Sequence, residues 1–234
     1  LQQGQIKNAQ VLWHGPVKQF PFEQGQGIFQ AQVKVVKGKL KFAPQWPALS
    51  NLDVNLLFEN KSLTMTSQQG RLLDVELQDL SAKIPQLQAN AVLTIDADAQ
   101  ASGQQVTELM LQSNLADTLG KTLQQVKVSG ALKTQLNLTI PLSGEALVAK
   151  GKLLLSDNKV ELPSLNILLQ QTNGTVNFIN SKIKASDLKA QLLQQPITLH
   201  LTGAQEDKGY QTDININGNW EVTPLLESFS AGLA

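Results

Sequence analysis

The regular alternation of apolar and polar residues constrains the fold of this chain more than any other feature of its sequence. In the stretch ANAVLTIDADAQ (residues 89–100), one side carries Leu93, Ile95, Ala97 and Ala99, and the other carries threonine, aspartate and glutamine. A period of two is typical of β-strands with one apolar and one polar face. Turn-forming stretches such as SDNK and EDKG recur about every 8–14 residues, a spacing typical of antiparallel sheets. We therefore predict a mainly β chain, and the lack of alternating long helices argues against a parallel α/β fold.

One segment departs from this period. Residues 103–125 place Val106, Leu109, Leu115, Leu119 and Leu123 at helical spacing, which predicts a short helical insertion of two helices. A further short helix is predicted in the stretch TPLLESFSAG (residues 223–232), where a proline follows the first residue.

The same apolar pattern occurs twice, at a constant offset of 120 residues. Residues 20–42 align with residues 140–162, and residues 57–65 align with residues 177–185, without a gap. Since any two strands of period two agree at an even offset, the informative matches are Pro21/Pro141, Phe58/Phe178 and Asn60/Asn180. We therefore predict two repeats, 1–102 and 126–234, separated by the helical insertion 103–125. Such tandem units bury their uncovered faces by stacking end to end.

The charge balance argues against two kinds of partner. The 234 residues carry 19 basic and 19 acidic side chains, so there is no electrostatic case for binding nucleic acid or an anionic membrane surface. About one residue in eight is glutamine, so the polar faces are built mostly from uncharged amides.

The chain has no cysteine, which excludes disulfides, thiol nucleophiles and thiolate metal sites. Neither a signal peptide nor an apolar run long enough for a spanning helix is visible.

No group of residues indicates catalysis. His14 and His200 are the two histidines, and neither has a cysteine or carboxylate at metal-binding spacing. Asp96 and Asp98 lie on the polar side of one predicted strand, where solvated side chains are expected. Nucleotide-binding loops and a nucleophile elbow are absent. We predict no enzymatic activity, no metal site and no cofactor.

The apolar face is aliphatic. The chain has seven Phe, three Trp and one Tyr, and most apolar positions are Leu, Val, Ile or Ala. An ordinary β-sandwich fills its interior with large side chains that usually include aromatics. An aliphatic face suits either such a filled core or a curved sheet that stays open to acyl chains, and the pattern alone leaves both possible. Trp13 and the Trp46-Pro47 pair are expected to pack at strand ends or to close one mouth of a channel.

Four stretches resemble the AsmA-like proteins of Gram-negative bacteria. They are VLWHGPVKQFPF (11–22), WPALSNLDVNLLFENKSLTM (46–65), VTELMLQSNLADTLGKTLQQVKVSGAL (106–132) and LNLTIPLSG (136–144), and the resemblance covers essentially the whole chain. These proteins are similar to the bridge-like lipid transfer proteins of the chorein type. The resemblance implies an elongated, twisted antiparallel sheet curled into an open groove, in an internal fragment without the family's membrane anchor.

The implied function is to carry phospholipid acyl chains along this groove between the inner and outer membranes. The resemblance implies a location in the periplasm, as the soluble part of a protein anchored in the inner membrane. A lipid tail gains about 0.8 kcal/mol for each methylene moved from water to an apolar lining, and aliphatic side chains offer this gain without orienting a headgroup. The residues expected to line the groove are Val33, Val35, Leu93, Ile95, Val126, Val128, Leu132, Leu136, Leu138, Leu153, Leu155, Ile197, Leu199, Leu201, Ile214 and Ile216.

Two other functions stay open at this point. The chain could be a structural or assembly scaffold of the envelope with a filled β core, or part of an outer-membrane barrel with its apolar face toward lipid. The scarcity of Tyr and Trp and the charges scattered among the strands argue against the barrel. Exposed β edges also predict that two copies of this chain can pair edge to edge as a dimer.

Overall fold

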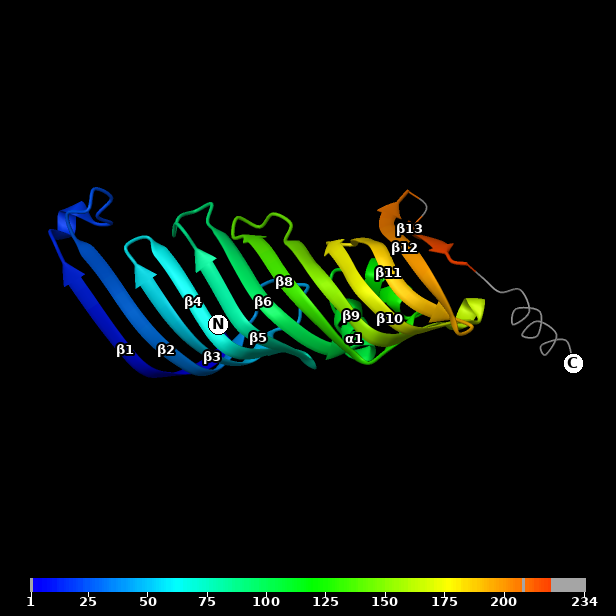
Figure 1. Cartoon of the computed structure of the whole chain (residues 1–234). Coiled ribbons are helices and arrows are strands. Elements are labelled where there is room, and N and C mark those ends of the chain that lie inside the picture. Colours follow the sequence, from blue (N-terminus) through cyan, green and yellow to red (C-terminus); the bar gives the residue numbers. More distant parts are fainter. Residues whose placement is uncertain (1, 208, 220–234) are drawn as a thin grey trace, which may run out of the picture. The chain divides into compact units, whose positions relative to one another are not determined.

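A computed structural model describes residues 2–207 and 209–219. In this part of the chain, thirteen strands form one open antiparallel sheet, in which the strand order follows the sequence from β1 to β6 and from β8 to β13, while β7 pairs with β9 (Figure 1). The predicted fold class, a mainly β chain with an antiparallel sheet and a short helical insertion, is confirmed. The strands are β1 (Gln3–His14), β2 (Ile28–Leu40), β3 (Leu49–Glu59), β4 (Ser62–Leu72), β5 (Val75–Ile84), β6 (Val92–Ser102), β7 (Lys127–Ser129), β8 (Ala131–Pro141), β9 (Val148–Leu162), β10 (Ile167–Ile179), β11 (Lys182–Leu192), β12 (Gln195–Glu206) and β13 (Gly209–Asn217).

The helical elements are short. The predicted insertion 103–125 contains the helix α1 (Gly103–Leu111), one turn of π-helix η2 (Ala116–Gly120) and the turn α2 (Lys121–Leu123). Two single turns of 3₁₀-helix, η1 (Val17–Gln19) and η3 (Pro163–Leu165), precede β2 and β10. The helix predicted at residues 223–232 lies outside the described residues.

The chain divides into two compact units. Unit 1 comprises residues 1–100, 112–114 and 134–151, and unit 2 comprises residues 101–111, 115–133 and 152–234, so that β8 and β9 contribute residues to both. This division follows packing rather than sequence repetition. The repeats 1–102 and 126–234 therefore stay a prediction.

Directly opposed residues separate the two faces of unit 1. One row crosses six strands and is wholly apolar: Ala9, Val33, Leu56, Met65, Ala82 and Ile95. The next row is wholly polar: Asn8, Lys34, Asn55, Thr66, Ser81 and Asp96. Opposed residues share a face and consecutive residues point to opposite faces. The alternation read from the sequence therefore becomes one apolar and one polar face of this unit.

Unit 2 shows the same separation. Ala185 is opposite Leu201, which is opposite Ile214, and the adjacent polar row contains Lys184, Thr202 and Asp213. Cross-strand pairs of this kind contribute about 0.2–1 kcal/mol each, so the rows both define the faces and stabilise the sheet.

Residues in the left-handed conformation occur within strands and in the turns between them, and four of these residues recur 120 positions later. Lys37 has φ of 52° and lies at a register shift between β2 and β3. Asp157 has φ of 56°, and the buried positions of β9 change there from Leu155 to Asn158, as they do at a bulge. A bulge adds one residue to a strand, so the apolar side changes from odd to even positions there and stays on the same face. The other pairs at this offset are Asn51 and Gln171, Asn60 and Asn180, and Leu73 and Leu193. Pro21 and Pro141 differ: Pro21 follows a cis peptide bond in a loop, and Pro141 ends β8.

Candidate functional site: the apolar face of the sheet

In unit 1, six of the residues predicted to line a groove lie on the apolar face. Leu93, Ile95 and Leu138 are buried in one cluster, which we call the unit 1 cluster. The other buried members of this cluster are Leu63, Ile84, Ala91, Ile140 and Ala149. Leu136 packs against this cluster. Val33 and Val35 belong to the adjacent strand β2, where Val33 is opposite Leu56 and Val35 is buried. The structure thus brings these six side chains to one side of the sheet.

In unit 2, nine predicted residues share the corresponding face. Leu132, Leu155, Ile197 and Leu199 are buried in the unit 2 cluster, together with Leu169, Ala185, Leu188 and Ala190. Val128, Leu153, Leu201 and Ile216 pack against this cluster. Ile214, opposite Leu201, is 42% exposed. Val126 lies in the connection between α2 and β7, outside the strands.

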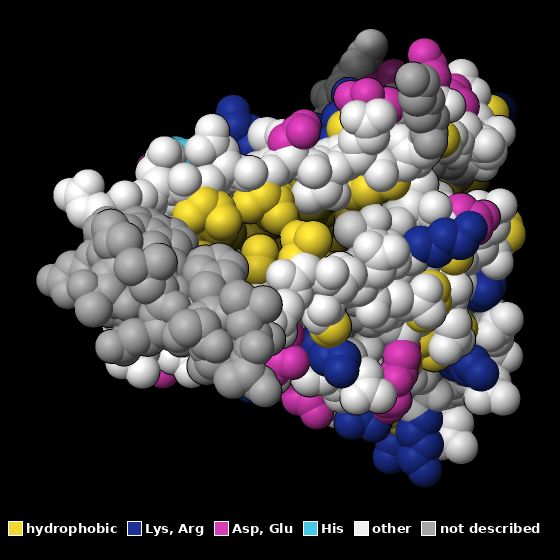
Figure 2. Space-filling model, turned by 90° about the vertical axis from the view of Figure 1, so that its right-hand side faces the viewer, with side chains coloured by type: hydrophobic (Ala, Val, Ile, Leu, Met, Phe, Trp, Pro, Cys, Tyr) yellow, Lys and Arg dark blue, Asp and Glu magenta, His cyan; other side chains and the backbone are white. Residues whose placement is uncertain are grey.

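The apolar face is exposed at the first and last strands. On β1, Val11 is 70% exposed and is opposite Ala31, which is opposite Phe58 of the apolar face. Its neighbour Leu12, 51% exposed, belongs to the polar face because it is opposite Gln30. Figure 2 shows hydrophobic side chains gathered in a recess that is bordered mainly by uncharged polar side chains and backbone, with charged side chains farther out. The apolar face is therefore accessible at these strands, while its central residues are closely packed.

Each unit covers its apolar face differently. In unit 1, Phe42 from the β2–β3 connection packs against the unit 1 cluster, and its ring centroid lies 6.1 Å from that of Trp46. In unit 2, Val106 from α1 packs against the unit 2 cluster. Gly103 permits this approach, since a Cβ atom there would lie 2.5 Å from the Val128 carbonyl oxygen. The helical insertion is thus a cover for unit 2.

Polar side chains that the sequence analysis did not single out are buried in the apolar face of unit 2. Asn158 is 0% exposed, donates to the carbonyl oxygens of Ser129 (3.1 Å) and Ala131 (3.3 Å), and accepts from the Ser156 N–H (2.7 Å). It thereby holds the kink at Gly130, whose φ is 100°. Thr172 is 1% exposed, and its hydroxyl has no partner among the described residues.

Two more buried polar atoms lack a partner in the described residues: the Tyr210 hydroxyl of unit 2 and the Trp46 indole nitrogen of unit 1. Burial raises the pKa of Tyr210 to about 12, because the phenolate would lose its hydration. The bulges shift Asn158 and Thr172 onto the apolar face, which a strict period of two could not indicate.

One rim of unit 1 is tied together by its loops. Phe29 and Asn60 exchange two hydrogen bonds of 2.9 Å, the Leu87 N–H donates to the Lys61 carbonyl oxygen (2.6 Å), and the Leu142 N–H donates to that of Ala91 (2.8 Å). These bonds join successive connections along the edge of the apolar face. The rim is therefore a continuous structure in unit 1.

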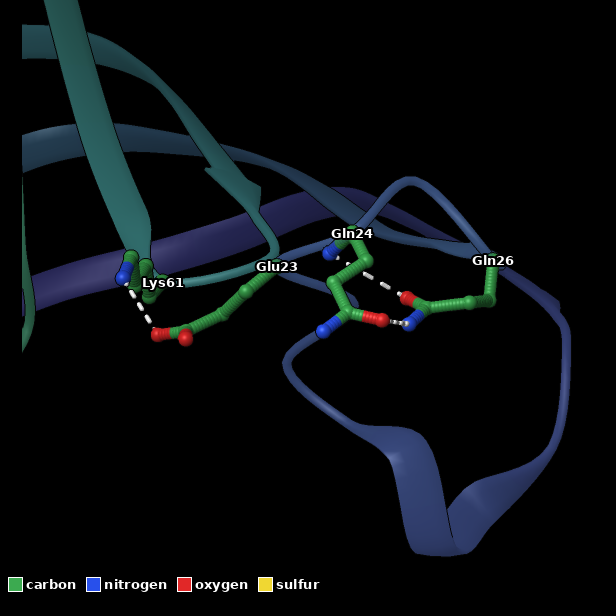
Figure 3. Close-up of polar contacts among 4 residues, drawn as sticks. All are labelled: Glu23, Gln24, Gln26 and Lys61. Atoms are coloured by element: carbon green, nitrogen blue, oxygen red, sulfur yellow. Dashed lines mark hydrogen bonds and ion pairs between the residues drawn. The ribbon is translucent and has the colours of Figure 1, made fainter.

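The β1–β2 loop is fastened to the same rim. Lys61 forms an ion pair of 2.6 Å with Glu23, and Gln24 and Gln26 bond to each other within the loop (Figure 3). The hydrogen bond and charge of Lys61 hold the pKa of the Glu23 carboxyl below its usual value. Two rings of this loop, Phe20 and Phe22, pack with the rings of Trp13 and Phe29, and neighbouring ring centroids lie 5.5–5.9 Å apart. Trp13 thus packs at a strand end.

The residues considered for catalysis lie apart from one another. His14 is the exposed last residue of β1, and His200 points to the polar face of β12. Asp96 accepts a hydrogen bond of 2.7 Å from the Asn137 amide on the polar face. Residues 2–207 and 209–219 contain no group of three or more His, Asp or Glu side chains arranged to hold a metal ion. Within the same residues, no helix has the length and apolar character needed to cross a membrane.

Comparison with known proteins gives one family. The sequence model of the YhdP protein family matches residues 1–234. The intermembrane phospholipid transporter YhdP of Escherichia coli (strain K12) is 35% identical over 221 residues, which are 94% of this chain and 17% of that protein. The chain therefore spans about one sixth of the length of this relative. No solved structure matches the chain. These matches confirm the resemblance found in the sequence.

Proposed function

Because the chain belongs to the YhdP family, we propose that its apolar face lines a groove for phospholipid acyl chains, as one segment of a conduit between the inner and outer membranes. The relative that transports phospholipid between membranes matches nearly the whole chain. The role is passive and non-enzymatic, and its place is the periplasm.

The single observation that carries this proposal is the apolar row across six strands of unit 1, from Ala9 to Ile95, beside an equally long polar row. A row perpendicular to the strands runs along the sheet, which is the direction a lipid would have to travel. Each methylene that moves along it stays in contact with aliphatic side chains and keeps its gain of about 0.8 kcal/mol. The six side chains of this row are all apolar, so the row itself contacts acyl chains and does not bind a headgroup.

Close packing in the centre of the apolar face limits where acyl chains can enter. Leu138 is 4% exposed and Leu199 is 5% exposed, so acyl chains can enter only where side chains or their covers move aside. The exposed apolar residues of β1 and β13 need no such movement. We therefore propose that acyl chains contact these strands first.

The same packing supports a second candidate, an envelope scaffold whose core is filled by its own side chains. In that case the clusters of both units are ordinary cores, and the exposed apolar residues of β1 and β13 contact other protein segments rather than lipid. The two candidates differ in what Val11 and Ile214 touch.

Neighbouring residues of β1 give a matched test. A photo-crosslinking amino acid replaces Val11 on the apolar face in one variant and Leu12 on the polar face in the other. We expect crosslinks to phospholipid from position 11 and few from position 12 after irradiation of cells that produce the protein. Equal yields at both positions, or crosslinks to protein alone from position 11, would favour the scaffold.

A further inference from the structure

We propose that the β2–β3 connection of unit 1 (residues 41–48) carries a subsite for a glycerophospholipid, in which the Lys41 ammonium binds the phosphate and the Trp46 indole N–H donates to an ester oxygen. The inference rests on the proposed function and names the part of the apolar face that recognises the polar end of the lipid.

Trp46 supplies an unused donor. Its side chain is only 6% exposed, and Nε1 is buried without an acceptor among the described residues. An indole N–H can only donate, and buried tryptophans usually find a partner for it. The missing partner must be an acceptor that reaches the inner side of this connection, as the ester oxygen of a lipid on the apolar face would.

Lys41 supplies a positive charge in the same connection. Its ammonium donates to the Trp46 carbonyl oxygen, which fixes the cation to the same connection. An ammonium has three N–H donors, so two remain for a ligand. Among the described residues no carboxylate forms an ion pair with Lys41. A phosphate would therefore meet a cation that is not already neutralised.

Phe42 connects these polar groups to the apolar face. It packs against the unit 1 cluster, and its ring centroid lies 6.1 Å from that of Trp46. The connection thus combines a cation, an unused indole N–H and a ring on the apolar face, which are the groups that the phosphate, the ester and the acyl chains of a glycerophospholipid would contact. Tryptophan suits such a boundary because one end of its ring system is apolar and the other polar.

The hydrogen bonds of this connection are internal to it. The Trp46 backbone N–H donates to the Ala43 carbonyl oxygen (3.3 Å), and the Lys41 ammonium donates to the Trp46 carbonyl oxygen. Both bonds therefore begin and end within residues 41–48. Lifting the connection breaks neither bond. Such a movement would give a ligand on the apolar face access to the Trp46 indole N–H.

Unit 2 lacks these groups at the equivalent positions. At the offset of 120, Glu161 replaces Lys41 and Asn166 replaces Trp46. Glu161 pairs with Lys159 at 2.6 Å, and the hydrogen bond and charge of this lysine lower the pKa of Glu161. A negative, already paired side chain repels a phosphate, so the subsite belongs to unit 1 alone.

The test uses Trp46 as the reporter. Changing Trp13→Phe and Trp220→Phe leaves Trp46 as the only tryptophan, and acyl chains that carry bromine quench its fluorescence on contact. The probes are brominated phosphatidylglycerol in detergent micelles and the diacylglycerol with the same chains, with glycerol 3-phosphate as a competitor without chains. Native mass spectrometry counts bound lipid independently of the quenching.

We expect phosphatidylglycerol to bind about tenfold more tightly than the diacylglycerol, as one charge-assisted contact predicts. Lys41→Met should abolish this ratio, whereas Lys39→Met in the preceding strand β2 and Glu161→Gln in unit 2 should keep it. Trp46→Phe, measured by mass spectrometry, should weaken both lipids about fivefold. Glycerol 3-phosphate should not compete at equal concentration.

Equal affinity for the two lipids, or an unchanged ratio in Lys41→Met, would overturn the subsite and leave the groove standing. Bound lipid without quenching of Trp46 would do the same. Competition by glycerol 3-phosphate at equal concentration would show a phosphate site unrelated to lipid and would also overturn it. Failure of the unmodified protein to bind either lipid would remove the proposed function along with the subsite.

Discussion

In unit 1, Lys37 adopts a left-handed conformation and its N–H is bound by the Asp53 carboxylate at 3.1 Å. In unit 2, 120 positions later, Asp157 adopts the same conformation and its N–H is bound by the Asn173 side chain at 2.9 Å. None of the four residues is conserved between the units, yet the bulge and its side-chain cap recur. We propose on this basis that the two segments are copies of one unit.

The units differ where their apolar faces are filled. Gly38 and Leu52 are opposite each other in unit 1, and the equivalent positions of unit 2 hold Asn158 and Thr172. A Cβ atom at Gly38 would lie 3.2 Å from both the Cβ and the carbonyl oxygen of Leu52, so a side chain at position 38 would press against Leu52. The comparison teaches that backbone irregularities set which residues face inward, and that each unit then fills its own face.

Removing the buried Asn158 side chain from the apolar face of unit 2 should have the largest effect. Asn158→Ala leaves the Ser156 N–H and two carbonyl oxygens without their partner, which should lower the free energy of unfolding by about 3 kcal/mol. The matched change in unit 1, Gly38→Ala, should cost less because no hydrogen bond is lost. Urea denaturation of both variants measures the difference. A cost for Asn158→Ala below that of Gly38→Ala would mean that Asn158 does not hold the kink at Gly130.

Replacing Gly38 and Leu52 by the residues at the equivalent positions of unit 2 should show that the two positions are coupled in their effect on stability. Gly38→Asn alone overpacks the Leu52 position and should cost about 1–3 kcal/mol. The double variant Gly38→Asn/Leu52→Thr should recover at least about 1 kcal/mol relative to the sum of the single changes. A double-mutant cycle from urea denaturation tests this. Additive effects would show that the two positions do not share one space.

The single tyrosine of the chain reports on the last strand of unit 2. Because burial raises the pKa of Tyr210 to about 12, absorbance of the phenolate in the folded protein should appear near pH 12. In the unfolded chain a tyrosine titrates near pH ~10, so between these values only the unfolded state loses the proton. Stability should therefore fall as the pH rises above ~10, by at most about 2 kcal/mol after allowance for solvent screening. Tyr210→Phe should remove this fall, and a titration midpoint near pH ~10 in the folded protein would refute the burial of the hydroxyl.

The shared bulge caps should give the smallest effects. Asp53→Ala removes the one bond from the Lys37 N–H and should cost about 1 kcal/mol. Asn173→Ala removes the bond from the Asp157 N–H and also the bond of 2.7 Å that the Asn173 amide donates to the Gln171 carbonyl oxygen, so it should cost about 1–2 kcal/mol. Thermal or urea unfolding of the two variants provides the comparison. A cost in one unit and none in the other would argue that the bulges arose separately rather than by repetition.

Much of the fold could be predicted because a period of two leaves little choice of face. Leu93, Ile95, Leu199 and Leu201 were placed on the apolar side from alternation alone, and the structure has them there. The helical insertion followed from its own period. The bulges could not be predicted, since an extra residue at Lys37 or Asp157 changes the parity of the strand without a distinctive residue type.

The features that close the apolar face were also beyond the sequence. Asn158 reads as a turn residue in SDNK, yet it lies within β9 and bonds to carbonyl oxygens on both sides of Gly130. Val126 fits the alternation but lies outside the strands, because the chain is still leaving the helical insertion. Which side chains cover a face depends on residues far apart in sequence, and alternation carries no information about them.

The most direct test of the account is native mass spectrometry of the protein purified from bacteria without added lipid. Two double variants carry matched changes at exposed residues: Val11→Asp/Ile214→Asp on the apolar face, and Leu12→Asp/Leu154→Asp on the polar face, where Leu154 is 46% exposed. The account predicts co-purified phospholipid on the unmodified protein and on the polar-face variant, and at least a severalfold loss of it from the apolar-face variant. A lipid-free mass for folded, unmodified protein that takes up no offered phospholipid would contradict it, as would equal lipid on both variants.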